Sequence, residues 1–125
     1  MRLRYKTAVA VLLIISGCSS SDITSPDQIV FPVTGVSFKA QVEPLFSLSC
    51  NVTGCHDQAR SDNNMVDLTT WGNVRSLNVV DQPGDTNCGM LRVVFGRELH
   101  PGPLKVNDNH KQGLRQWVIE GAQNN

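Results

Sequence analysis

The sequence predicts an all-α fold, a small helical domain with long loops, and two amphipathic segments carry this prediction. In the first segment, Phe38, Val42, Leu45 and Phe46 fall at positions i, i+4, i+7 and i+8, which share one face of a helix. In the second, residues 107–120 near the end of the chain have a similar helical spacing of apolar side chains. No run shows a clear strand pattern, and 125 residues leave room for one such domain.

Shorter elements are expected between these two segments. Pro44 cannot donate a backbone hydrogen bond, so we expect a kink or the start of a new helical turn at this residue. Residues 67–77 predict a short helix that is capped by Asp67 or Thr69. Residues 89–95 form a short apolar segment that is either helical or extended.

The closing helix has the clearest predicted boundaries. Asn107 or Asp108 can cap its start, it reaches about Glu120, and Gly121 can end it. The residues expected on its buried face are Leu114, Trp117 and Val118. The loops are long for a domain of this size. Such loops favour a large bound group around which they can pack.

The first residues are expected to be an export signal. A basic stretch precedes the apolar run at residues 7–15, and this run is too short for a stable membrane span. The tetrad Ile15-Ser16-Gly17-Cys18 then resembles a bacterial lipobox, which implies cleavage before Cys18 and lipidation of its thiol and new amino terminus. The alternative is an ordinary signal peptide that happens to meet a cysteine.

The chain therefore divides into three predicted parts. They are a lipoprotein signal peptide at residues 1–17, a lipidated cysteine with a flexible tether at residues 18–35, and a folded domain at residues 36–125. Within the tether, the apolar run Ile29-Val30-Phe31 could dock on the domain. Cleavage removes three of the 11 basic residues and none of the 11 acidic ones, which leaves a net charge of −3.

These features predict a bacterial cell-envelope protein that its acyl chains hold on a membrane. Ser19, directly after the lipidated cysteine, favours the outer membrane, facing the periplasm or the cell surface. No Lys/Arg-rich run or basic-aromatic face suggests a nucleic-acid partner.

The stretch "SCNVTGCH" at residues 49–56 carries the candidate chemistry. A covalent haem-attachment motif normally reads C-x-x-C-H, whereas here four residues separate Cys50 from Cys55, and His56 follows directly. Attachment needs two thiols that reach the haem vinyl groups and an imidazole just beyond the second thiol. The two extra residues can bulge outward, and Gly54 suits a bulge because glycine tolerates a positive φ. A C-x4-C-H haem site is therefore chemically workable.

On these residues alone, other interpretations stay open. Two cysteines in an exported protein most often form a disulfide, so Cys50 and Cys55 could staple a haem-free interaction domain. A zinc site is a weaker interpretation, because the paired C-x2-C spacing typical of zinc is missing. Its ligands would come from Cys50, Cys55, His56 and one of Cys88, His100 or His110.

Longer stretches around the motif resemble a known family. They are "VSFKAQVEPLFSLSCNVTGCH", "VDLTTWGNV", "VVDQPGDTNCGMLRVV" and "HPGPLKVNDNHKQGLRQWVIEGA". In order and spacing they are similar to small class-I-like c-type cytochrome domains of exported and lipid-anchored bacterial proteins. Members of this family commonly show F-x3-V-x-P-[IL]-F before the haem cysteines, a P-G-D-x-x-x-S-x-L-like segment, and M-P-P-G-G-x-L before a terminal helix that ends in W-I-x-x-G-A. The resemblance covers about residues 36–122.

The resemblance implies a cytochrome c-like helical fold with long loops around one covalent haem c. Cys50 and Cys55 then form the haem thioethers, and His56 is the proximal iron ligand. Where the family places the distal methionine of M-P-P, this chain has His100 between Leu99 and Pro101.

The sixth iron position is therefore expected to belong to His100, which lies on a loop stiffened by prolines. Met90 is the alternative ligand, Met65 stands behind it, and an open site is a further alternative. The usual role of an isolated methionine is core packing.

The remaining candidate residues are expected to be structural. His110, on a polar stretch at the start of the last helix, is expected to be exposed. Cys88 is expected to be a buried, inert thiol, with an intermolecular disulfide as the exception. Trp71 and Trp117 are expected to pack in the haem pocket or between helices, and an indole hydrogen bond to a haem propionate is an alternative.

The predicted function is that of a lipid-anchored monohaem c-type cytochrome, an electron carrier rather than an enzyme. It would exchange single electrons with a redox partner protein or a membrane redox complex. The alternatives are the haem-free, disulfide-stapled lipoprotein and an open-site haem protein that binds gas or peroxide. With two histidine ligands, the reduction potential is expected to be lower than that of a His/Met cytochrome.

Overall fold

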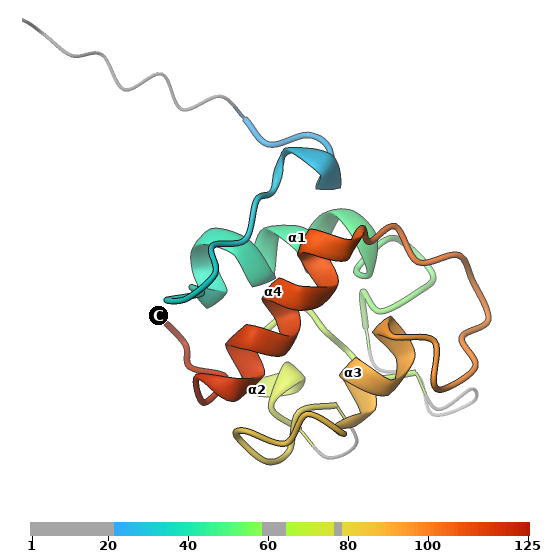
Figure 1. Cartoon of the computed structure of the whole chain (residues 1–125). Helices are drawn as coiled ribbons and strands as arrows, with labels where there is room; N and C mark the ends of the chain where they lie inside the picture. The colour runs from blue at the N-terminus through green and yellow to red at the C-terminus, as the bar shows by residue number, and fades with distance from the viewer. Residues whose placement is uncertain (1–21, 59–64, 77–78) are drawn as a thin grey trace, which may run out of the picture.

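A computed structural model describes residues 22–58, 65–76 and 79–125 of the chain, and every regular element in this part is a helix (Figure 1). The elements are the 3₁₀ turn η1 (Pro26–Gln28), the π-helical η2 (Phe38–Val42), α1 (Glu43–Ser49), α2 (Trp71–Val74), α3 (Gly89–Val94) and α4 (Asp108–Ile119). The helical class predicted from the sequence is confirmed. The export signal and Cys18 lie outside the described residues. Within the described ranges, no helix has the length and apolar character needed to cross a membrane.

The first predicted helix is present, and its hydrogen-bonding pattern changes near the proline. The π-helical η2 runs directly into α1, and Pro44 lies in the first turn of α1. Before the proline, Val42 N–H and Glu43 N–H donate five residues back, to the carbonyls of Ser37 and Phe38. A new helical turn therefore starts at Pro44, in a position where the missing N–H is tolerated.

The predicted short helix in the middle of the chain is α2, but its cap is neither of the two expected residues. Thr70 caps α2, because its side-chain oxygen accepts a hydrogen bond from Asn73 N–H at 3.2 Å. The carboxylate of Asp67 instead accepts from the backbone N–H and the hydroxyl of Thr69, at 2.7 and 2.6 Å. This local turn lowers the pKa of Asp67, chiefly through the hydrogen bond from the Thr69 hydroxyl.

The boundaries predicted for the last helix are confirmed. Asn107 caps α4 by accepting a hydrogen bond from His110 N–H at 3.0 Å. At the other end, Gly121 has a φ of +98° and Ala122 N–H donates to Trp117 C=O at 2.9 Å, which is the six-to-one bond of a Schellman motif. Glycine is suited to this position because it adopts a positive φ without steric cost.

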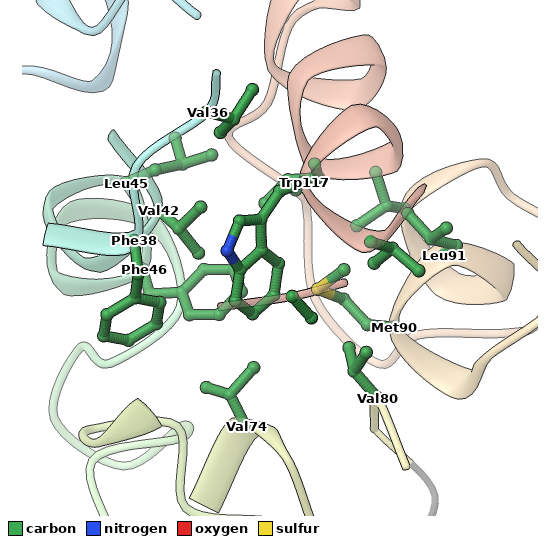
Figure 2. Packing of buried hydrophobic residues seen from close by; sticks show 14 of the residues in the cluster. Val36, Phe38, Val42, Leu45, Phe46, Val74, Val80, Met90, Leu91 and Trp117 are labelled. Carbon is green, nitrogen blue, oxygen red and sulfur yellow. The ribbon is translucent and has the colours of Figure 1, made fainter. Parts of the chain in front are cut away.

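The core forms around Trp117, whose side chain is fully buried. Figure 2 shows its indole reaching from α4 between Phe38 and Phe46 on one side and Leu91 of α3 on the other. The Trp117 and Phe38 rings have centroids 5.7 Å apart, within the range of favourable aromatic pairs. Further members of this cluster are Val36, Val42, Leu45, Val74, Val80, Leu114 and Val118. The predicted buried face of α4 is thus confirmed.

The core begins before residue 36, because Ile29 and Phe31 are buried at 3% and 4% exposure. Both backbone groups of Phe31 are held by one side chain: its N–H donates to Asn109 Oδ1 at 2.9 Å and its C=O accepts from Asn109 Nδ2 at 3.1 Å. A β-carbon at Gly113 would overlap the Phe31 ring, so the glycine allows this ring to lie against α4. We call residues 22–36 the leader segment; the part of the expected tether that the structure describes is packed on the domain.

The prediction that His110 is exposed is wrong, because the leader segment covers the first turn of α4. The His110 side chain is fully buried. Its Nδ1 accepts from Asn107 N–H at 3.2 Å, so the ring proton is on Nε2, which donates to Ile29 C=O at 3.0 Å. His110 therefore links the leader segment to the helix and takes no part in the pocket described below.

Candidate functional site

One pocket, with a cavity volume of about 300 Å³, brings together the residues that the sequence singled out. Cys50, Cys55 and His56 line it from the loop after α1, Met90 from α3, and His100 from the loop between α3 and α4. Met65, the third methionine considered as a ligand, does not line this pocket. The structure thus places five candidate residues from three parts of the chain around one cavity.

The wall of this pocket is mainly apolar. Its apolar residues include Phe46, Val52, Val66, Leu68, Val79, Val93, Val94, Leu104, Val106 and Leu114. Ser49, Glu98 and Lys105 add a few polar groups. An apolar cavity with few polar groups is typical of small-molecule and cofactor sites, which have volumes of roughly 300–1,000 Å³. Many of these residues lie in the middle of the chain, where the sequence pattern is weak, so the sequence did not identify them.

The loop between the two cysteines has the geometry that the extra residues require. Cys50 ends α1 with its N–H donating to Phe46 C=O at 2.8 Å, and Cys50 C=O accepts from His56 N–H at 3.1 Å. This second bond closes the loop at its base. Gly54 has a φ of +85°, as expected, and Val52 and Thr53 are exposed. The middle of the four-residue loop is therefore exposed, while both cysteines stay partly buried.

The two cysteines of the motif are free thiols that lie close enough to influence each other. Burial raises the pKa of Cys50 to about 12, and the neighbouring Cys55 thiol contributes to the same rise. Cys50 is therefore protonated at neutral pH.

His56 is oriented by its backbone and by its ring. Its Nδ1 lies 2.8 Å from Val66 C=O, and a carbonyl can only accept, so Nδ1 carries the proton. His56 C=O in turn accepts from Leu68 N–H at 3.1 Å. In the neutral ring the lone pair is then on Nε2, and this arrangement, with Nδ1–H donated to a carbonyl, is typical of a histidine that binds a metal.

His100 has the same ring arrangement. Its Nδ1 lies 2.8 Å from Gly102 C=O, which again requires a proton on Nδ1. Gly102 N–H also lies near this nitrogen, at 3.3 Å, but a protonated Nδ1 cannot accept it. The reverse assignment would set two lone pairs against each other at 2.8 Å, so we assign the shorter contact as the hydrogen bond. In the neutral ring, the lone pair of His100 is therefore also on Nε2.

The two imidazole rings face the same region of the pocket. The centroids of His56 and His100 lie 6.0 Å apart, and the ring planes make an angle of 31°. Two imidazoles that bind one ion from opposite sides, with metal–nitrogen bonds of about 2.0–2.1 Å, have centroids roughly 6.3 Å apart. The observed separation is close to that value.

Met90, the alternative iron ligand, also lines the pocket. It is the second residue of α3, only 8% of its surface is exposed, and it contributes to the hydrophobic core. Met90 therefore contributes to the packing of the core, whether or not its sulfur also binds a metal ion.

Asn51, in the loop between the two cysteines, does not line the pocket but helps to position this loop. Its Nδ2 donates to Leu68 C=O at 3.0 Å, which ties the inserted loop to the segment after the site. Its Oδ1 is buried and has no hydrogen-bond partner among the described residues. No sequence signal pointed to this role.

The tryptophans and Cys88 lie outside the pocket. The indole N–H of Trp71 donates to Ala122 C=O at 2.8 Å, and that of Trp117 donates to Gln123 C=O at 3.0 Å. Both donors are therefore used within the protein, and neither is available for a bound acid group. Cys88 is buried, as predicted, and burial raises its pKa.

The part of the chain that the structure describes shows no metal site made of protein ligands alone. Within residues 22–58, 65–76 and 79–125, no group of three or more His, Cys, Asp or Glu side chains could hold a metal ion. No family model, curated protein or solved structure matches the chain.

Proposed function

We propose that this protein is a monohaem c-type cytochrome that carries single electrons and is held on a membrane by a lipid at Cys18. One observation carries the proposal: two thiols and two imidazoles, each imidazole with its Nδ1 bound to a backbone carbonyl, line the same apolar pocket. When bound, the haem supplies reversible one-electron chemistry at its iron.

The donor set fits a haem better than it fits a bare metal ion. Haem iron takes four ligands from the porphyrin, so the protein has to supply only two, which here are His56 and His100. Cys50 and Cys55 would form the thioether bonds that hold the group. The apolar wall keeps water from the porphyrin faces, and exclusion of water is one of the factors that set the reduction potential.

The second hydrogen bonds of the histidines prepare them for this role. Val66 C=O fixes the tautomer and the plane of His56, and Gly102 C=O does the same for His100. Such partners orient a ligand and raise its basicity. Two histidine ligands in place of His/Met favour the lower reduction potential that the sequence predicted.

The location of the electron carrier follows from the amino-terminal residues. The lipobox at Ile15–Cys18 would place a lipid on Cys18, after which the chain is anchored in the bacterial cell envelope. The partner is then a redox protein or a membrane redox complex that reaches the haem pocket.

The proposal is tested by producing the protein with a cytochrome c maturation system and recording a pyridine haemochrome spectrum. We expect one covalent haem per chain, seen as a mass gain of roughly 616 Da. Cys55→Ser should lose one thioether bond, whereas Cys88→Ser, at a buried cysteine outside the pocket, should keep both. No covalent haem under these conditions would overturn the proposal.

The proximity of the Cys50 and Cys55 thiols favours one other candidate, a haem-free lipoprotein stapled by a disulfide. The mass separates the two cases, because a disulfide removes about 2 Da and adds no group. In that case the protein would be colourless after maturation, and reduction would restore two reactive thiols.

A further inference from the structure

The outward face of the leader segment exposes apolar side chains next to buried ones. Val30 is 72% exposed and Val33 is 89% exposed, while Ile29 and Phe31 point into the core. Ile23, nearer the amino terminus, is 44% exposed. We define these three exposed residues, Ile23, Val30 and Val33, as the leader face.

The leader face is held in place by hydrogen bonds to α4 and to the residue after it. Asn109 binds both backbone groups of Phe31, and His110 donates to Ile29 C=O. The Glu120 carboxylate accepts from Gly35 N–H at 2.8 Å and from Val36 N–H at 2.9 Å. Val30 and Val33 therefore belong to the folded domain rather than to a free linker.

This attachment shortens the distance between the domain and the lipid at Cys18. A free tether as far as residue 36 could extend about 60 Å, whereas the 11 residues from Cys18 to Ile29 reach at most about 36–40 Å. The five residues from Cys18 to Ile23 reach at most about 17–18 Å. Ile23 is thus confined to the neighbourhood of the bilayer.

The charges on the leader segment indicate which kind of contact it can make with lipid. Residues 22–36 contain Asp22 and Asp27, both exposed, and no Lys or Arg. Attraction to anionic lipids requires basic residues near the surface. Any contact with lipid through this face must therefore come from apolar side chains at the interface, and it does not need acidic lipids.

We propose that the leader face rests on the bilayer in which Cys18 is anchored, and that this contact sets the orientation of the domain. The proposal rests on the lipidation that the proposed function includes. In Figure 1 the leader segment crosses one side of the domain, and the loop between α3 and α4, which carries His100, lies at another edge. The orientation therefore leaves the pocket loop accessible to a soluble partner.

The test uses the mature, lipidated full-length holoprotein added to preformed phosphatidylcholine vesicles. Single cysteines are introduced by Val33→Cys or Val30→Cys, and the matched control is Leu99→Cys, at a side chain that is 99% exposed beside the pocket loop. Both probe sites are exposed, so the substitutions spare the core. The rate of alkylation by a charged, impermeant maleimide is measured on vesicles and on the soluble Cys18→Ser form.

We expect vesicles to slow alkylation at residues 33 and 30 roughly tenfold, and at residue 99 by less than about twofold. Adding phosphatidylglycerol should not increase the protection. Equal rates at residues 33 and 99, on protein that floats with the vesicles, would overturn the proposal while leaving the lipid anchor intact. Protection that is also present in the soluble Cys18→Ser form would indicate a second copy of the chain and overturn it as well.

Failure of the anchor gives a different result. Protein that lacks acyl mass and does not float with vesicles refutes the lipidation, and the orientation proposal falls with it. Failure of the haem proposal is independent, because mass and absorbance report it separately.

Discussion

The imidazole rings of His56 and His100 lie 6.0 Å apart, although one follows α1 and the other belongs to the loop before α4. Each ring is oriented by a hydrogen bond from Nδ1 to a backbone carbonyl. In the neutral rings both lone pairs are then on Nε2, and both residues line one cavity, an arrangement suited to a metal that needs two axial ligands.

His100→Ala tests whether this pair binds the iron. We expect the low-spin absorbance spectrum of the holoprotein to change to a high-spin one and carbon monoxide to bind the reduced form readily, because one iron position opens. Met90→Leu is the matched control and should leave the spectrum unchanged, since leucine conserves the packing volume. An unchanged spectrum in His100→Ala together with a changed one in Met90→Leu would assign the ligand to Met90.

Gly113→Ala tests the packing of the leader segment on α4. The added methyl group overlaps the Phe31 ring, so we expect the free energy of unfolding to fall by about 1–3 kcal/mol in denaturant titrations. Gly102→Ala is the control, because a β-carbon there meets no atom within 4 Å. Adding Phe31→Ala should make Gly113→Ala nearly neutral. Equal destabilisation in both backgrounds would show that the two residues do not compete for space.

Asn109→Ala tests the hydrogen bonds that hold Phe31. The variant leaves an N–H and a C=O in the partly buried backbone without their partner, so we expect a loss of about 1–3 kcal/mol in the free energy of unfolding. Gln112→Ala, an exposed amide on the same helix, should change it by less than about 0.5 kcal/mol. Limited proteolysis should also cut the leader segment faster in Asn109→Ala, and equal cutting rates would contradict this role.

The acid sensitivity of the fold should depend in part on Glu120. Hydrogen bonds from Gln116, Gly35 and Val36 lower the pKa of its carboxyl. A lowered folded-state pKa stabilises the fold above the ordinary glutamate pKa of about 4.3, and this contribution is lost as the pH falls through the lowered value. We therefore expect Glu120→Gln to flatten the dependence of unfolding free energy on pH below about 5. Identical pH profiles for the variant and the wild type would refute the contribution.

Local patterns in the sequence were sufficient for several features of the fold. The helical spacing of apolar residues predicted α1 and α4, and the boundaries of α4 followed from Asn107 and Gly121. The positive φ of Gly54 was also predicted. These features depend on interactions between neighbours in the chain, which a linear pattern records directly.

Other features required contacts between distant parts of the chain. His110 looked exposed because its neighbours in sequence are polar, yet Ile29 and Phe31 cover it from the other end of the domain. The cap of α2 went to Thr70 because Asp67 forms its own turn with Thr69. The spacing of residues in the sequence predicts neither the burial of His110 nor the cap of α2. Each depends on which hydrogen-bonding and packing partners the fold brings together.

The candidate site likewise has features that the sequence predicted and features that only the structure shows. The sequence identified the cysteines, His56 and His100 as chemically suitable groups, since residue type and order are local information. Their convergence on one apolar cavity, the free Nε2 atoms and the unpartnered Asn51 oxygen depend on how the loops pack against α1, α3 and α4. Burial and hydrogen-bond geometry are properties of the packed chain, which is why these facts became visible only in three dimensions.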